Sequence, residues 1–170
     1  MALLKDDELI PLLTGTKLIV AGLPQPPTLP TPPGGTAPDS WYGPKSAVQP
    51  SSVDLHIGAI LLPGVGEDEP GGVTQPKEDH TLRFGHTAVI TSQEQLNLPN
   101  HIAALGFPPA RLSFRGLLMT NPGHVDPGYV GLMRFTVMNV GREDITLRRG
   151  DPIVTLLFFR LNGDTRAVTS

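Results

Sequence analysis

The residues that most often do chemistry are few in this chain. It has no cysteine, which excludes disulfides, thiolate nucleophiles and cysteine-ligated zinc. Its five histidines lack a metal-binding spacing such as His-x-x-x-His, so we predict no metal site. The acids and histidines that remain are therefore candidates for hydrogen bonding and proton transfer, and their surroundings decide which of them matter.

Two aspartates have an informative local setting. Asp126 begins an Asp-Pro-Gly run, which favours a type I or II turn, and His124 lies two residues before it. Asp126 is therefore either a simple turn residue or a functional carboxylate, and His124 is the histidine that we would test. Asp54 lies inside an apolar strand, and we expect it to be a structural hydrogen-bond acceptor.

The elements that position these residues are mostly strands. Glycine and proline number 19 each, which favours many turns and short strands. Residues 2–13 place apolar side chains at helical intervals and predict one short helix, ended by Pro11 and Gly15. From residue 50 onward short apolar segments alternate with turns. We predict strands in 51–62, 86–92, 101–107, 129–139 and, broken at 150–152, in 145–161, an all-β sandwich or jelly roll.

Residues 23–49 form a proline-rich insertion within one domain of residues 1–170. No periodic apolar face can form there, so we expect a loop or polyproline II segment. It is either a flap or an extended strap on a neighbour. The sequence does not identify a protein partner for this loop.

The charge balance excludes some partners. The net charge is −3, which does not suit a protein whose main partner is duplex nucleic acid. No run reaches transmembrane length, and the first residues do not resemble a secretion signal. We expect a cytoplasmic protein that binds neither nucleic acid nor membrane.

Several motifs, in order, carry a family resemblance. Residues 48–58 (VQPSSVDLHIG) resemble the first motif of dCTP deaminases, and 96–104 resemble the stretch before their phosphate loop. Residues 124–131 resemble the signature that these enzymes share with dUTPases. The closing strands match at 139–141 and 158–161, and the opening ALLKDDELI resembles the family's N-terminal helix.

This resemblance implies a distorted jelly roll of the dUTPase-like (β-clip) type with a short N-terminal helix. It also implies a homotrimer with nucleotide sites between subunits, and deamination of dCTP to dUTP without zinc. Asp126 would lie at the deoxyribose, and the Tyr129 ring would pack under the sugar and exclude a 2′-hydroxyl. No cofactor is required, and Mg²⁺ enters only as the nucleotide's counter-ion. The expected ligand is a deoxynucleotide of the dCTP, dUTP and dTTP class.

The chain departs from the family where the chemistry is done. The general-base glutamate of the family falls, by ungapped counting, on Thr136, whose hydroxyl has no useful basicity near neutral pH. The family's phosphate loop loses its register, leaving Arg111, Ser113 and Arg115 nearby. These are either a shifted anion site or two solvated arginines. Arg134 shares a strand face with Thr136 and points either into the pocket or to solvent.

Residues 162–170 resemble neither form of the family's closing lid, so we expect the lid to be absent or supplied otherwise. Asp126 is the one catalytic candidate. We predict a dCTP deaminase-like protein with impaired or lost catalysis. The alternative is a non-catalytic trimer that binds a nucleotide or has a regulatory or structural role. The predicted substrate-binding residues are Arg111, Ser113, Arg115, His124, Asp126, Tyr129, Arg134, Phe135 and Thr136.

Overall fold

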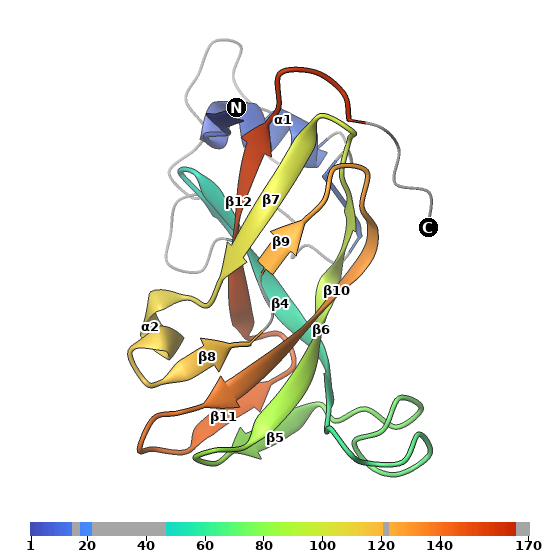
Figure 1. Cartoon of the computed structure of the whole chain (residues 1–170), viewed down its shortest axis with the longest axis vertical. Coiled ribbons are helices and arrows are strands. Elements are labelled where there is room, and N and C mark those ends of the chain that lie inside the picture. Colours follow the sequence, from blue (N-terminus) through green and yellow to red (C-terminus); the bar gives the residue numbers. More distant parts are fainter. Residues whose placement is uncertain (15–17, 22–46, 121–122, 166–170) are drawn as a thin grey trace.

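The computed structural model describes residues 1–14, 18–21, 47–120 and 123–165 (Figure 1). Strands dominate them, with one nine-residue helix and one short helical turn. The elements are β1 (Ala2–Leu3), α1 (Asp6–Thr14), β2 (Ile19–Ala21), β3 (Val48–Gln49), β4 (Ser52–Leu61), β5 (Asp79–Leu82), β6 (Thr87–Asn97), β7 (Ile102–Phe107), α2 (Ala110–Ser113), β8 (Leu117–Met119), β9 (Gly123–Val125), β10 (Val130–Asn139), β11 (Ile145–Arg148) and β12 (Pro152–Arg160).

The main sheet is antiparallel and nearly closes on itself. Its strand order is β8-β10-β6-β4-β12-β7-β9, with β1 on β12, β2 on β6 and β3 on β4. A separate two-stranded sheet, β11-β5, lies at one end of the molecule (Figure 1). The predicted all-β architecture with a short N-terminal helix is confirmed. The edge strands of the main path are β8 and β9, and the site described below lies between them.

The core follows from strand alternation. On β10, Met133, Phe135 and Val137 are buried while the residues between them face outward. On β4, Val53, Leu55 and Ile57 are buried, as their alternation predicts. The buried apolar side chains of the described residues form one connected cluster.

Several boundaries differ from the sequence-based prediction, among them the end of β6, which runs to Asn97 rather than residue 92. The helix begins at Asp6 rather than residue 2, because Ala2 and Leu3 pair with β12. Its end at Thr14, directly before the predicted stop Gly15, is within one residue of the prediction, and the buried Leu9 and Leu13 hold the helix against the core on both sides of Pro11. The predicted loop 23–49 ends in a strand, because β3 pairs with β4.

The sequence analysis also missed five short elements: β2, β5, α2, β8 and β9. Most of the proline-rich insertion lies outside the described residues, so its role and the single-domain assignment of 1–170 stay predictions. Within the described part of the chain, none of the helices has the length and apolarity needed to cross a membrane.

Candidate functional site

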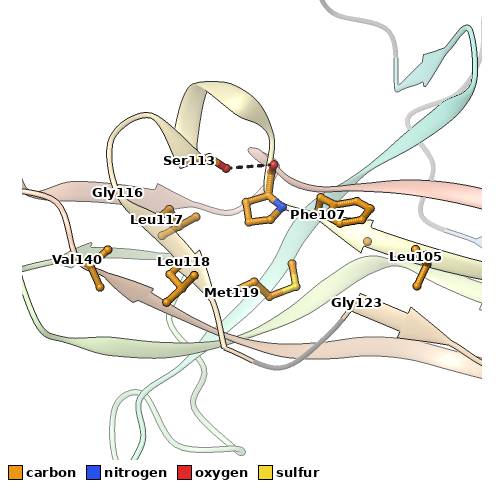
Figure 2. A pocket seen from close by; sticks show the side chains of 11 residues that line it. Leu105, Phe107, Ser113, Gly116, Leu117, Leu118, Met119, Gly123 and Val140 are labelled. Carbon is orange, nitrogen blue, oxygen red and sulfur yellow. Dashed lines mark hydrogen bonds between the residues drawn. The ribbon is translucent and has the colours of Figure 1, made fainter.

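An apolar pocket lies where the main sheet fails to close. Its volume is about 470 Å3. Both edge strands line it, together with β7, α2 and the turn after β10, and Figure 2 shows their side chains around it. The lining residues are Leu105, Gly106, Phe107, Pro108, Ser113, Gly116, Leu117, Leu118, Met119, Gly123 and Val140. Most of this surface is apolar, so the pocket offers a ligand van der Waals contact more than hydrogen bonds.

Helix α2 holds Arg111 and Ser113, and Arg115 follows two residues after its end, so the three residues predicted as an anion site are spread apart. Arg111 donates from Nη2 to the Pro152 carbonyl at 2.9 Å, whereas Arg115 donates from Nη2 to the Asp144 carbonyl at 2.9 Å. Ser113 lines the pocket, and its Oγ lies 3.4 Å from the Pro108 carbonyl (Figure 2). The two guanidinium groups are thus tied to different segments and do not converge on one point.

Strand β9 brings His124 to the rim of the pocket. Leu105, which lines the pocket, is the register partner of His124, and neighbouring residues in antiparallel register share a sheet face. His124 Nε2 lies 3.6 Å from Asp126 Oδ1, and both side chains are more than half exposed. The two residues that the sequence analysis singled out therefore do lie together, in open solvent beside the pocket.

Tyr129 closes the turn that Asp126 begins. The Tyr129 backbone N–H donates to the Asp126 carbonyl at 3.2 Å, which makes the predicted turn. Its hydroxyl donates to the Leu132 carbonyl at 2.7 Å, and its ring packs against the core cluster. The turn also depends on Gly128, where φ is +79°, a backbone conformation that favours glycine.

Strand β10 carries the remaining predicted residues on opposite faces. Arg134 and Thr136 share the outward face, as expected from the alternation, with Arg134 exposed and Thr136 half-buried. The Phe135 ring is 1% exposed and belongs to the core. The Phe135 side chain therefore faces the interior, opposite to Arg134 and Thr136. The Thr120 N–H donates to the Thr136 carbonyl at 2.9 Å, so the end of β8 lies alongside this residue.

One polar pair in the core was missed by the sequence analysis. The Glu94 side chain is fully buried, and both of its carboxylate oxygens contact the same residue, His56. Oε2 accepts the His56 backbone N–H at 2.8 Å, and Oε1 lies 2.6 Å from His56 Nδ1. The signal was the strand period: Glu94 is in phase with the buried Ile90 and Leu96.

Two further polar residues complete the electrostatic description. Asp54 accepts a hydrogen bond from the Thr155 hydroxyl at 2.6 Å, so the predicted structural role is confirmed. Partial burial, aided by the positive charges of Lys77 and of His86 when protonated, lowers the pKa of His80 below its usual value of 6.5. His80 belongs to the β5-β11 sheet and not to the pocket. Among the described residues, no cluster of His, Cys, Asp or Glu has the geometry of a metal site.

Comparison with known proteins places these features in a family. The dCTP deaminase-like family profile matches residues 41–161. A "dCTP deaminase, dUMP-forming" of Beutenbergia cavernae is 31% identical over 129 residues, covering 68% of this chain and 67% of that protein. A protein of the same description from Methanobrevibacter smithii is 25% identical over 127 residues, covering 65% of this chain and 66% of the relative.

Among solved structures, 2′-deoxycytidine 5′-triphosphate deaminase from Agrobacterium tumefaciens superposes with a TM-score of 0.62 at 18% identity. That match covers 92% of this chain and 47% of the other, and at this identity it speaks for the fold alone. The chain thus spans about two thirds of the length of the curated relatives and about half of the solved one.

Proposed function

The chain belongs to the dCTP deaminase-like family, and from that premise we propose that it binds a deoxynucleoside triphosphate while deaminating dCTP slowly or not at all. Hydrolytic deamination needs a group that takes a proton from water and passes it to the leaving ammonia. In a site without zinc, that group has to be a side chain of suitable basicity, normally a carboxylate. The question is therefore whether this chain has a carboxylate where the family needs one.

The observation that carries the proposal is the composition of β10 around Thr136. No residue of β10 is acidic, and Thr136 lies on the outward face between Arg134 and Met138. Its partner on β6 is Val89, and its neighbour at the end of β8 is Thr120. The stretches of strand beside Thr136 thus offer hydroxyl, methyl and guanidinium groups, none of which can act as a general base at neutral pH.

Two nearby carboxylates do not replace the missing base. Glu94, on the strand next to β10, is completely buried, and both of its oxygens are occupied by His56. Asp126 is exposed beside His124, in the turn after β9, and in our proposal it serves the sugar of the ligand. Its place on a turn that follows β9, and not on β10, argues against its reaching the position of the family's base.

The ligand side of the proposal rests on the turn of residues 126–129. We propose that Asp126 accepts the 3′-hydroxyl and that the Tyr129 ring supports the deoxyribose, with Mg²⁺ present as the counter-ion of the phosphates. The ring is anchored by its packing and its hydroxyl bond, so it is a rigid platform. Arg111, Ser113, Arg115 and Arg134 are the candidates for the phosphates and base, and the separate ties of Arg111 and Arg115 predict weak phosphate binding.

We also propose that the functional unit is a homotrimer. The support is the exposed apolar surface beside the pocket, since monomeric proteins seldom leave such groups open to water. Leu105, Phe107, Leu118 and Val140 line the pocket and are each at least 39% exposed. Light scattering at micromolar concentration should return a trimer mass, and a monomer mass would contradict this part of the proposal.

The experiment that tests the function measures binding and turnover on one sample. The protein is titrated calorimetrically with dCTP and Mg²⁺, and ammonia release is then followed, with the Agrobacterium tumefaciens deaminase as the positive control. We expect measurable binding and a rate about 10²- to 10⁴-fold below that of the control, the usual effect of losing a general base. Ammonia release of about 1 per second or faster would contradict it.

A further inference from the structure

Three strands lose their regular register at one level of the sheet. Between β10 and β6 the pairing passes from Leu132↔Gln95 to Arg134↔Thr91, so β6 advances by four residues while β10 advances by two. Between β4 and β6 the pairing shifts at the same level, near Gly58. A Cβ on Gly58 would lie 2.7 Å from the Ser92 carbonyl oxygen, so β4 and β6 touch closely there. Such bulges bend a strand and re-aim the side chains beyond them.

A continuous polar network spans the three strands at this level. The Met133 N–H of β10 donates to Ser92 Oγ at 2.9 Å, and Ser92 Oγ donates to the Glu94 carbonyl at 2.8 Å. The Glu94 carboxylate then accepts from His56 of β4. Ser92 and Glu94 are both buried. The network therefore replaces, with side-chain bonds, the ladder bonds that the bulge removes.

A buried carboxylate is costly, and its cost points to a role in specificity. Apolar residues of the same size often stabilise a core as well as or better than a buried ionic pair. What a satisfied polar pair adds is discrimination against other arrangements, because a wrong register leaves its groups without partners. A slip of β10 by one residue would turn its outward side chains inward. Arg134 and Thr136 are the first outward residues of β10 beyond the bulge.

We propose that His56 and Glu94 are positioning residues, which fix the register at which β10 presents Arg134 and Thr136 to the nucleotide. They act through Ser92 and Met133, and neither touches the ligand. The inference rests on the proposed function for its ligand, although the register itself can be measured without one.

The test compares two substitutions at one position. In Glu94→Gln the amide oxygen still accepts the His56 N–H, and the amide NH₂ donates to Nδ1 of a neutral His56, so the network survives. Glu94→Leu keeps the volume and removes both bonds. Leu147→Ala is the control, because it opens the core in β11, a strand that does not pair with β10. The readouts are the melting temperature, the dCTP dissociation constant with Mg²⁺, and hydrogen exchange at the amides of residues 133–137.

We expect Glu94→Leu to weaken dCTP binding about tenfold or more and to speed exchange across residues 133–137. Glu94→Gln should restore both to the parent values. Leu147→Ala should lower the melting temperature while changing neither. Parent-like binding and exchange in Glu94→Leu would overturn the proposal, and so would a loss in Leu147→Ala that equals the loss in Glu94→Leu.

Two further outcomes are decided by the same measurements. If the parent binds no dCTP, the proposed function fails, and exchange at residues 133–137 alone then supports or overturns the positioning role. If Glu94→Leu does not fold, Ser92→Ala takes its place, since it removes the acceptor of the Met133 N–H with little change in volume. Faster exchange at residues 133–137 in that variant supports the proposal, and unchanged exchange overturns it.

Discussion

Two histidine–carboxylate pairs show how burial changes what the same chemistry does. His56 and Glu94 lie 2.6 Å apart, with side chains 12% and 0% exposed. His124 and Asp126 lie 3.6 Å apart, with side chains 54% and 62% exposed. The first pair has no access for a ligand but holds strands together. The second pair contributes little to holding the strands together, but it is accessible to a ligand beside the pocket.

The difference has an energetic cause. A pair in water is screened, and holding two side chains in one geometry costs about as much entropy as their attraction returns. A pair in the core has no water to replace a missing partner, so breaking it is expensive. The buried pair is therefore expected to govern stability and register, and the exposed pair to govern ligand selection.

The largest effect should come from breaking the buried pair. Glu94→Ala leaves the His56 backbone N–H without its acceptor and should lower the free energy of unfolding by about 3 kcal/mol. Glu78→Ala is the control, because Glu78 pairs with Arg149 at 3.1 Å on the surface. That variant should lose less than about 1 kcal/mol. Urea denaturation measures both. Equal losses would mean that burial does not separate the pairs.

The next effect concerns the ligand and the turn after the exposed pair. If the deoxyribose lies on the Tyr129 ring, a 2′-hydroxyl would be desolvated without a partner, which costs about 1–3 kcal/mol, or up to roughly a hundredfold in affinity. The parent should therefore prefer dCTP, dUTP and dTTP over their ribose counterparts, and Tyr129→Ala should lose the preference. Calorimetric titration checks this. Equal affinities of the parent for the ribose and deoxyribose forms would mean that the Tyr129 ring only packs against the core and does not select the sugar.

His80 provides an intermediate case of burial. Its folded-state pKa is lowered, so below about pH 6.5 the unfolded chain takes up a proton more readily than the folded protein does. The free energy of unfolding should therefore fall as the pH drops from 6.5 toward the lower folded-state value, and this contribution should vanish above 6.5. His80→Gln should lose less stability between pH 7 and 5.5 than the parent in urea titrations. An equal loss would show that His80 contributes nothing to the pH dependence.

The strand pattern was enough to predict the fold but not the details of the site. The alternation of Val53, Leu55 and Ile57 predicted β4, because a buried strand face repeats every second residue. The short β8 and β9 carry too few residues for a period and form only because β10 and β7 pair with them. Helix α1 runs through Pro11 and ends directly before Gly15, one of its two predicted stops, because tertiary packing of Leu9 and Leu13 outweighs the local cost of the proline.

Whether a contact between two polar residues could be predicted from the sequence depended on how far apart they are along the chain. His124 and Asp126 are two residues apart, so their proximity could be predicted from the sequence. His56 and Glu94 are 38 residues apart, and their contact depends on a bulge that no local pattern encodes. The directions of Arg111 and Arg115 were equally hidden, since each is set by a distant carbonyl.

The smallest effect should come from the exposed pair itself. Asp126→Asn keeps a side chain that suits the first position of the turn and removes the charge that faces His124. At 3.6 Å and with both groups more than half exposed, the lost attraction should change the free energy of unfolding by less than about 0.5 kcal/mol at pH 7. Urea denaturation in low and high salt measures this change in the free energy of unfolding, because any contribution of the pair should weaken as salt screens it. A loss of more than about 1.5 kcal/mol in the free energy of unfolding would be typical of a buried pair, and it would contradict the expected difference between the two pairs.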